Sequence, residues 1–294
     1  MAIACRSRCL LRVTNTGKTP TPGSGGGSGR GTSNEATYWD AATYHRVADP
    51  QFQWGRRLLE QLELRGDETI IDAGCGSGRL TRLLLERVPD GRVIAVDVSP
   101  QMTDQARAYL EPEFDGRIEV LCRDLRKLDL EQVADVVFSS ATFHWIPEQD
   151  VLFQNVMRSL KAGGRLLAQM GGKGNLRRLL GRAEALAREP EFRSYFGDWA
   201  RPNVYPDEEE MGRRLEAIGF AEIQLDHFPE PTTFSDAAAF REFITTVIFR
   251  LDLQRLPDAQ MRQHFIDRLV SLAANDEPPF TLDYWRLNIS AFRR

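Results

Sequence analysis

The chain has 294 residues and a net charge of −4, with 42% hydrophobic and 27% charged residues, as in globular proteins large enough to bury a substantial core. Residues 1–34 hold five positive charges and no acid, so the remainder carries −9, which argues against sequence-independent binding of nucleic acid. No apolar run approaches the ~20 residues that span a bilayer. We therefore expect a cytoplasmic protein that binds small molecules and neither nucleic acid nor membrane.

Residues 1–34 have the composition of a disordered extension, because residues 19–29 form a Gly/Ser/Pro-rich linker with nothing to bury. The basic first dozen residues faintly resemble a transit peptide or a lipoprotein start, but their apolar stretch is too short for a secretory signal. We interpret residues 1–34 as a dispensable extension and expect the folded domain over residues 35–294.

From residue 51 onward, the apolar pattern predicts alternating helices and strands. In chain order these are a helix over 51–64, a strand over 69–72, a helix over 80–88, a strand over 92–97, a helix over 99–110, strands over 117–122 and 134–140, a helix over 148–160 ended by the glycine signal at 161–164, a strand over 165–170, a helix over 207–218 and a strand over 221–228. Helical insertions over about 175–201 and 236–275 interrupt the alternation, and residues 281–292 are strand-like. This order predicts a parallel sheet with helices on both faces.

Three glycines follow the first strand at alternate positions. The strand ends in Asp72, and Gly74, Gly76 and Gly78 come next, where the absence of Cβ atoms permits a tight turn and the close approach of a ligand. A nicotinamide dinucleotide site would need a glycine at position 79, which is Arg79. The spacing therefore disfavours a nicotinamide dehydrogenase.

Asp97 closes the second strand, 19 positions past Gly78, where a carboxylate can accept both hydroxyls of a ribose. Together with Asp72 and the glycines, it resembles the class I S-adenosylmethionine (SAM) methyltransferases, whose first motif reads Asp-x-Gly-x-Gly-x-Gly. The resemblance implies SAM as cofactor, with Asp72 suited to its cationic amino acid end. The alternative is a structural turn in another α/β protein.

The same resemblance implies further cofactor residues. Val98 and Met102 would flank the adenine, Asp124 would accept from its amino group, and the backbone N–H of Leu125 would meet a ring nitrogen. Ser139 is one of the small residues at the end of the fourth strand, where doubly wound sheets leave room for a ligand.

His144 and Trp145 follow that strand. They resemble a His-Trp or Gln-Trp element in a subgroup that includes trans-aconitate, malonyl-carrier-protein and juvenile-hormone-acid methyltransferases, which esterify carboxylic acids. His144 could act as a general base, donate a hydrogen bond to a carboxylate, or pack beside Trp145. We favour the donor, because a carboxylate needs no deprotonation at neutral pH.

The substrate side of the site is less well marked. Tyr44 and Trp54 are predicted to wall the pocket, although Trp54 could equally belong to the core. Arg250 lies in an apolar run and could clamp a substrate carboxylate, or pair with Asp252 or another acid. Two weaker candidates of the same kind are Arg201 and Tyr205.

We predict a Rossmann-like, doubly wound and mostly parallel sheet with a helical cap. The resemblance implies seven strands, of which the last, over 281–292, is antiparallel. The predicted activity is SAM-dependent O-methylation of a small organic or lipophilic carboxylic acid to its methyl ester. Two alternatives stay open: O-, N- or C-methylation of a secondary metabolite with His144 as base, and a SAM-binding regulatory protein without catalysis. No metal is expected. Cys75 and Cys122 are predicted to be small, reduced packing residues.

Overall fold

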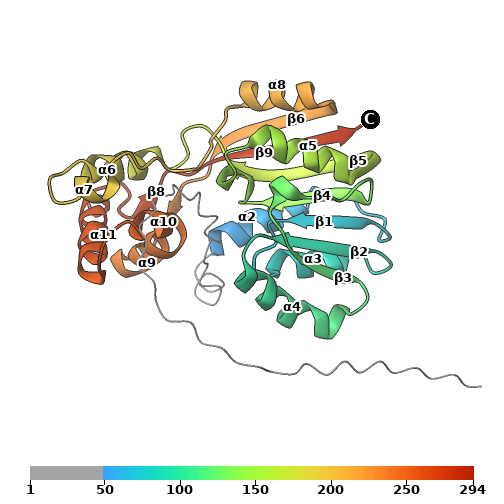
Figure 1. Cartoon of the computed structure of the whole chain (residues 1–294), viewed down its shortest axis with the longest axis horizontal. Coiled ribbons are helices and arrows are strands. Elements are labelled where there is room, and N and C mark those ends of the chain that lie inside the picture. The colour runs from blue at the N-terminus through green and yellow to red at the C-terminus, as the bar shows by residue number, and fades with distance from the viewer. Residues whose placement is uncertain (1–48) are drawn as a thin grey trace, which may run out of the picture. The chain divides into compact units, whose positions relative to one another are not determined.

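The computed structural model describes residues 49–294 (Figure 1). The expected extension over residues 1–34, the boundary at residue 35 and the side chain of Tyr44 lie outside the described residues.

One seven-stranded sheet organises the described chain, in the order β3-β2-β1-β4-β5-β9-β6. Its strands are β1 (Thr69–Ala73), β2 (Arg92–Asp97), β3 (Ile118–Cys122), β4 (Ala134–Ser140), β5 (Leu160–Gly171), β6 (Phe220–Pro229) and β9 (Trp285–Arg293). The pairs from β3 to β5 are parallel, and β9 is antiparallel to both of its neighbours. The predicted mostly parallel sheet with an antiparallel last strand is confirmed.

Helices cover both faces of this sheet, as the predicted doubly wound fold requires. On one face lie α2 (Asp49–Leu59), α3 (Arg79–Arg87) and α4 (Pro100–Phe114), which bury leucines against β1 and β2. On the other lie α5 (Gln149–Ser159) and α8 (Glu208–Ile218), together with the short helices η1 (Leu125–Lys127) and η2 (Phe143–Trp145). Ser99 caps α4 by accepting from the Met102 backbone N–H at 3.4 Å.

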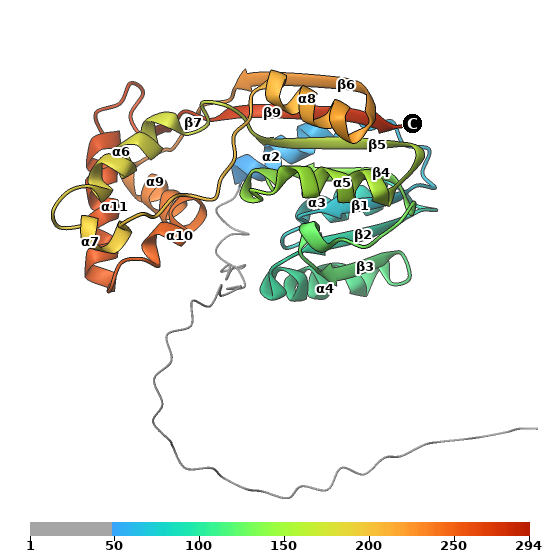
Figure 2. The ribbon, with the colours of Figure 1, turned by 45° about the horizontal axis from the view of Figure 1, so that its top comes forward.

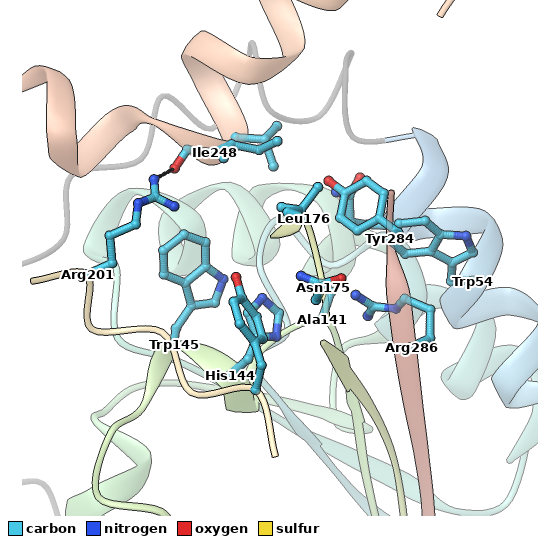
Figure 3. Close-up of a pocket in the computed structure, with 13 residues that line it drawn as sticks. Trp54, Ala141, His144, Trp145, Asn175, Leu176, Arg201, Ile248, Tyr284 and Arg286 are labelled. Atoms are coloured by element: carbon cyan, nitrogen blue, oxygen red, sulfur yellow. Dashed lines mark hydrogen bonds between the residues drawn. The ribbon is translucent and has the colours of Figure 1, made fainter. Parts of the chain in front are cut away.

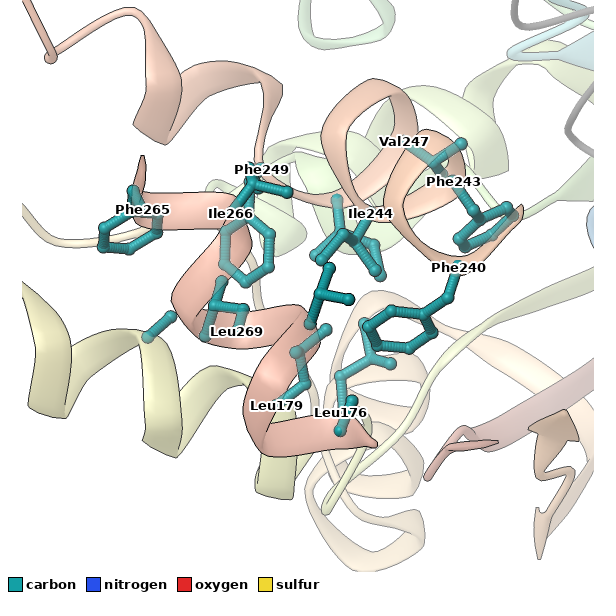
Figure 4. Packing of buried hydrophobic residues seen from close by; sticks show 14 of the residues in the cluster. Leu176, Leu179, Phe240, Phe243, Ile244, Val247, Phe249, Phe265, Ile266 and Leu269 are labelled. Atoms are coloured by element: carbon teal, nitrogen blue, oxygen red, sulfur yellow. The ribbon is translucent and has the colours of Figure 1, made fainter. Parts of the chain in front are cut away.

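The remaining helices form a cap beyond the carboxyl ends of the parallel strands (Figures 1 and 2). They are α6 (Arg177–Ala187), α7 (Arg193–Phe196), α9 (Ala237–Phe243), the π-helix η3 (Ile244–Ile248), α10 (Arg250–Leu253) and α11 (Ala259–Ala273). Figure 4 shows their shared core, in which phenylalanines of α9 and α11 pack against leucines of α6. The cap therefore has a hydrophobic core of its own.

Several predicted boundaries were wrong. Residues 161–164 were expected to end a helix but belong to β5. The pairing of β5 with β4 shifts in register at this point. Helix α2 ends at Leu59 rather than 64, since a turn carries Leu62 into the core. The expected strand over 281–292 is split: β8 (Thr281–Leu282) pairs with β7 (Thr232–Thr233) in a separate small sheet.

The two cysteines of the described chain are both free, but they differ in environment. Cys75 is buried in the glycine turn, as predicted, whereas Cys122 is exposed at the end of β3, so its prediction as a packing residue is wrong. Among residues 49–294, no helix combines the length and apolarity needed to cross a bilayer. Within the same residues, no group of three or more His, Cys, Asp or Glu side chains could hold a metal ion.

Candidate active site

The glycine turn between β1 and α3 is anchored on the neighbouring strand. The backbone N–H groups of Gly74 and Cys75 donate to the Val96 carbonyl at 2.7 and 3.0 Å. Gly74 has φ +88°, and a Cβ there would come within 2.1 Å of Thr142 Oγ1. Gly76 has φ +54°, and a Cβ there would meet nothing within 4 Å. Gly74 is therefore required by packing, whereas Gly76 faces open space in which a ligand can approach the backbone.

Asp97 ties the end of β2 to this turn. One carboxylate oxygen accepts from the Gly76 N–H at 3.0 Å and the other from the Ser99 N–H at 2.9 Å. Burial raises the pKa of Asp97, and hydrogen bonds from backbone N–H groups oppose that rise. The carboxylate is therefore fixed in place before any ligand arrives.

A cavity of about 380 Å³ opens in front of the turn, within the size range of small-molecule sites. We call it the cofactor cavity. Seven residues predicted to bind the cofactor line it: Gly74, Gly76, Asp97, Val98, Met102, Asp124 and Leu125. Further lining comes from Arg123, Arg126, Ser140, Ala141, Thr142, Trp145, Ile146, Pro147, Pro202 and Leu251. Segments that are distant in sequence thus meet at the carboxyl ends of β1, β2, β3 and β4.

Three other predicted cofactor residues lie behind the cavity wall. Asp72 is 2% exposed and accepts from the Thr81 hydroxyl at 2.7 Å. Ser139 is fully buried, and its hydroxyl donates to the Ala73 carbonyl at 2.7 Å, joining β4 to β1. A Cβ on Gly78 would come within 2.8 Å of the Leu110 side chain. In this structure all three support the turn from beneath, and their contact with a cofactor stays a prediction.

Asp124 lines the cavity, but its carboxylate already forms an ion pair with an arginine. Arg126 donates from Nη2 at 2.6 Å and also pairs with Glu148 at 3.0 Å. Burial alone would raise the pKa of Asp124, but the hydrogen bonds and charge of Arg126 bring it below its ordinary value. An adenine amino group at Asp124 would therefore share the carboxylate with Arg126.

A second, smaller cavity of about 40 Å³ adjoins the first (Figure 3). We call it the acceptor cavity. It is lined by Gln51, Trp54, Ala141, His144, Trp145, Asn175, Leu176, Arg201, Tyr205, Val247, Ile248, Tyr284 and Arg286. Ala141 and Trp145 line both cavities. Ala141 has φ +57°, a conformation uncommon outside glycine, and it turns the chain sharply after β4. The two cavities meet at this turn.

His144 is held in the wall of the acceptor cavity as a neutral imidazole. It is 7% exposed, and its ring stacks on Tyr205 with centroids 5.8 Å apart. Burial, aided by the charge of Arg286, lowers its pKa to about 3. The Gly171 backbone N–H donates to Nδ1 at 3.4 Å, which assigns the ring proton to Nε2. His144 is thus a hydrogen-bond donor and a weak base.

Trp54 lines the acceptor cavity, and it also packs in the core of the cap, edge-on to Tyr284 at 4.8 Å. Its contact with a substrate stays a prediction. The π-helix brings Val247 and Ile248 to the same wall. Such helices often occur at functional sites.

Arg250 and Arg201 were predicted as substrate-binding candidates of the same kind, but the structure places them differently. Arg250 begins α10, is half-buried and lines neither cavity. Asp252 pairs with Arg201, whose Nε donates at 3.0 Å. Arg201, predicted as a weaker candidate, does line the acceptor cavity, as does Tyr205. The role of Arg250 as a substrate clamp stays a prediction without support from this geometry.

Sequence reasoning missed Arg286, which lies on β9 and is 1% exposed. The only available signal was a single arginine within an apolar, strand-like run. It also missed Gln51, Asn175 and Tyr284, polar or aromatic residues that no local motif connects to the site.

Comparison with known proteins agrees with this geometry. Residues 70–164 match the family described as "Methyltransferase domain". A phosphoethanolamine N-methyltransferase 2 from Haemonchus contortus, solved in complex with S-adenosyl-L-methionine, has the same fold, with a TM-score of 0.57 and 18% identity over 86% of this chain and 56% of that one. These matches, with the fold and the glycine turn, make the chain similar to class I SAM-dependent methyltransferases.

Among curated proteins, the chain is similar to trans-aconitate 2-methyltransferases. It is 36% identical to the one from Azoarcus sp. over 45% of this chain and 50% of the relative. It is 28% identical to the one from Methylobacterium radiotolerans over 82% of this chain and 91% of the relative. It is also 36% identical to a malonyl-[acyl-carrier protein] O-methyltransferase from Acetivibrio thermocellus over 43% and 44%. The matches thus span about half the length of the Azoarcus and Acetivibrio relatives. Within its class, the chain is trans-aconitate methyltransferase-like.

The residues present fit S-adenosyl-L-methionine. Gly76 leaves its backbone open to the cavity, the fixed carboxylate of Asp97 would accept from a ribose, and Val98 and Met102 would supply apolar surface for an adenine. When bound, this cofactor supplies an electrophilic methyl group on a sulfonium.

The buried carboxyl of Asp72 is expected to lose a proton when the cofactor binds. Burial, the largest cause, raises its pKa to about 7 despite the Thr81 hydrogen bond. At pH 6.5 Asp72 is therefore largely protonated, and a nearby ammonium group would favour the carboxylate. We expect SAM binding to release protons at pH 6.5 and the affinity to rise between pH 5 and 7.

Calorimetric titrations at pH 6.5, in buffers of different ionisation enthalpy, measure this release. Asp72→Asn should abolish it and remove the rise in affinity with pH. Equal enthalpies in all buffers would mean that Asp72 only supports the turn and does not face the amino acid end of the cofactor.

Proposed function

We propose that this protein transfers a methyl group from S-adenosyl-L-methionine to the carboxylate oxygen of an organic acid, giving a methyl ester. The observation that carries the proposal is the junction at Ala141 and Trp145, where the cofactor cavity meets a small buried cavity that presents a neutral histidine donor and arginine side chains. The similarity to a trans-aconitate 2-methyltransferase and a malonyl-[acyl-carrier protein] O-methyltransferase also supports an acid as acceptor. A cytoplasmic location stays a prediction.

The residues of the chain would act by positioning. His144 Nε2–H donates to one carboxylate oxygen, which leaves the other oxygen free to face the junction. The indole of Trp145 lies at that junction and restricts the approach of the acceptor. A cavity of about 40 Å³ has room for roughly three water-sized groups, so a bound carboxylate displaces the water within it. Holding the reacting atoms ~3 Å apart supplies much of the rate enhancement in such a site.

The alternative in which His144 acts as a base has less support. A pKa of about 3 makes the imidazole a poor proton acceptor for a phenol or an ammonium group. The non-catalytic alternative does not account for a second cavity that shares two residues with the first.

A screen for methyl acceptors tests the proposal. The protein would be incubated with S-adenosyl-L-methionine and a panel of mono-, di- and tricarboxylic acids, each beside its primary amide and its primary alcohol. Phenols, amines and carbon acids would be included as alternative acceptors. Mass spectrometry of the products should show methyl esters from at least one acid and no product from the matched amide or alcohol. Methylation confined to phenols, amines or carbon acids would overturn the proposal, as would intact cofactor binding with no product from any acceptor.

The role of His144 can be tested by substitution. Hydrogen bonds to charged groups are worth ~1.5–3 kcal/mol, so His144→Leu should lower kcat/KM by about 10- to 150-fold. His144→Gln should keep most of the activity, because an amide N–H can replace the donor. With S-adenosyl-L-methionine saturating at every pH, the wild-type kcat/KM for the acid should show no inflection near pH 6.5, since the ring is already neutral above its pKa of about 3. Initial rates at pH 5–9 provide the measurement.

For a general base, the opposite pattern would appear. Both substitutions would then lower kcat alike, and the wild-type rate would rise with pH through the pKa of the imidazole.

A further inference from the structure

We propose that the acceptor is a monocarboxylic acid with an apolar body, whose carboxylate enters the acceptor cavity and whose body lies in a larger cavity within the cap. This inference rests on the proposed function and deepens it, by naming the class of acid. The acceptor cavity of about 40 Å³ holds little more than a carboxylate group, whereas cavities that bind whole small molecules measure ~300–1,000 Å³. The rest of the acceptor therefore needs a neighbouring space.

Such a space adjoins the acceptor cavity inside the cap. A cavity of about 620 Å³, which we call the cap cavity, shares Arg201 and Tyr205 with the acceptor cavity. Its apolar lining comes from α6, α11 and the chain between α6 and α8, and consists of Leu180, Ala183, Ala187, Phe196, Trp199 and Phe265. Phe265 also belongs to the cap core shown in Figure 4. An apolar body in the cap cavity is removed from water, which stabilises its binding.

Residues 201–205 border both the acceptor cavity and the cap cavity. They have no regular secondary structure, and the Val204 backbone N–H donates to the His144 carbonyl at 2.9 Å, which ties them to η2. The ring of Tyr205 stacks on His144, and Arg201 lies across the acceptor cavity from the sheet (Figure 3). A carboxylate held by His144 is therefore next to the side chain at which the two cavities meet, and the body of the acid passes beside Tyr205.

The charges that line the cap cavity disfavour a second carboxylate. Arg201 donates to Asp252 through Nε at 3.0 Å, so these two charges balance one another. The other charged side chains of the lining are two acids and one base, Glu184, Asp198 and Arg188, which leave one net negative charge. A dicarboxylate whose far end reached this cavity would meet that charge and would also have to shed water from its second carboxylate. The cap cavity therefore suits an uncharged body.

A second space that meets the acceptor cavity is less suited to such a body. It is an open groove, which shares Asn175 and Tyr205 with the acceptor cavity. Most of its lining side chains are charged or titratable: Lys173, Arg177, Glu184, His227 and Asp283. Burial of apolar surface there would be small, and a polar or charged tail would fit it better. The chemistry of the tail therefore distinguishes the groove from the cap cavity.

The first test varies the length of the acid with the wild-type protein. We would measure kcat/KM for saturated monocarboxylic acids from butanoic to octanoic acid, with S-adenosyl-L-methionine saturating. Each buried methylene should raise kcat/KM by about fourfold, so the value for octanoic acid should exceed that for butanoic acid by roughly 50-fold or more. Octanedioic acid carries a carboxylate in place of the terminal methyl group of octanoic acid, and its kcat/KM should be lower by roughly 50-fold or more.

The second test reduces the volume of the cap cavity. Ala187→Phe, at the end of α6, should lower the ratio of kcat/KM for octanoic acid to that for butanoic acid by about tenfold or more. Ala185→Phe is the matched control, because Ala185 lies on the same helix, is exposed and lines neither cavity, so it should keep the wild-type ratio. A general loss of folded protein would lower both values alike and leave the ratio unchanged.

The wild-type series covers the case in which Ala187→Phe does not fold. Equal kcat/KM values for butanoic and octanoic acid would overturn the inference, and so would methyl esters formed only from di- or tricarboxylic acids. A wild-type ratio in folded Ala187→Phe would overturn the placement of the body in the cap cavity. Absence of any methyl ester from the wild-type protein would instead overturn the proposed function, so the two failures are distinguishable.

Discussion

Asp97→Ala is expected to weaken the binding of S-adenosyl-L-methionine by about 100-fold or more. Its two carboxylate oxygens hold the Gly76 and Ser99 N–H groups at 3.0 and 2.9 Å and lie in the wall of the cofactor cavity. The substitution removes the acceptors for a ribose diol and releases the turn at once, and each charge-assisted hydrogen bond is worth ~1.5–3 kcal/mol. Isothermal titration calorimetry on the full chain measures the loss.

Asp104→Ala is the matched control for this experiment. Asp104 lies on the adjoining helix α4, is exposed and pairs with Arg107 at 2.9 Å, so its removal should change the affinity by less than twofold. The affinity of Asp97→Asn should lie between those of the wild type and Asp97→Ala, because the amide keeps one acceptor oxygen. An affinity unchanged in Asp97→Ala would contradict the assignment of this cavity to the cofactor.

Two glycine substitutions in the same turn are expected to separate stability from binding. Gly74→Ala would place a Cβ 2.1 Å from the Thr142 hydroxyl at φ +88°, and such overpacking with a left-handed backbone costs about 2–4 kcal/mol of the free energy of unfolding. In Gly76→Ala the new Cβ would meet nothing within 4 Å. Only the left-handed backbone conformation then lowers the free energy of unfolding, by ~1–2 kcal/mol. Its methyl group would nevertheless occupy the face that a cofactor approaches, and we expect a loss of affinity of about 30-fold.

Urea unfolding and calorimetric titration of both variants provide the measurements. Gly181→Ala is the control, because Gly181 lies within helix α6 with no atom near its Cβ position, and alanine there should stabilise by roughly 0.5–1 kcal/mol. A Gly76→Ala protein that binds S-adenosyl-L-methionine like the wild type would show that the cofactor does not lie against this turn.

The fold could be predicted from sequence because its strands and helices carry strong local patterns. β4 over residues 134–140 and β2 over 92–97 were placed to the residue, since a buried parallel strand is a short β-branched and apolar run between turn signals. The segment over 161–164 was misassigned. Two glycines after a helix are a common stop signal, and only the pairing of Leu160 and Arg165 with β4, on either side of them, shows that they lie within a strand.

The cofactor side of the site was predictable for a similar reason. Its residues lie at the carboxyl ends of the parallel strands. A pattern that predicts these strands therefore also predicts which residues meet at that edge of the sheet. The sequence pattern alone could not distinguish residues that line the cofactor cavity from residues that support the glycine turn. Asp72 and Ser139 belong to the second kind and lie beneath the cavity wall. The acceptor side depends on long-range packing. Arg286 comes from β9, more than 140 residues after His144. Arg250 was favoured on its apolar neighbours, but it is not among the residues that line either cavity.

The central claim is that the product is a carboxylic ester formed with the methyl group of the cofactor. The direct test uses S-adenosyl-L-methionine tritiated in that methyl group, incubated with the protein and the acid panel, followed by mild alkali and vapour-phase collection of methanol. Methyl esters release volatile labelled methanol under these conditions, whereas methyl ethers, methylamines and C-methyl groups do not. We predict acid-dependent volatile label that falls at least 50-fold in Asp97→Ala. Label that enters the product but resists alkali would contradict the account.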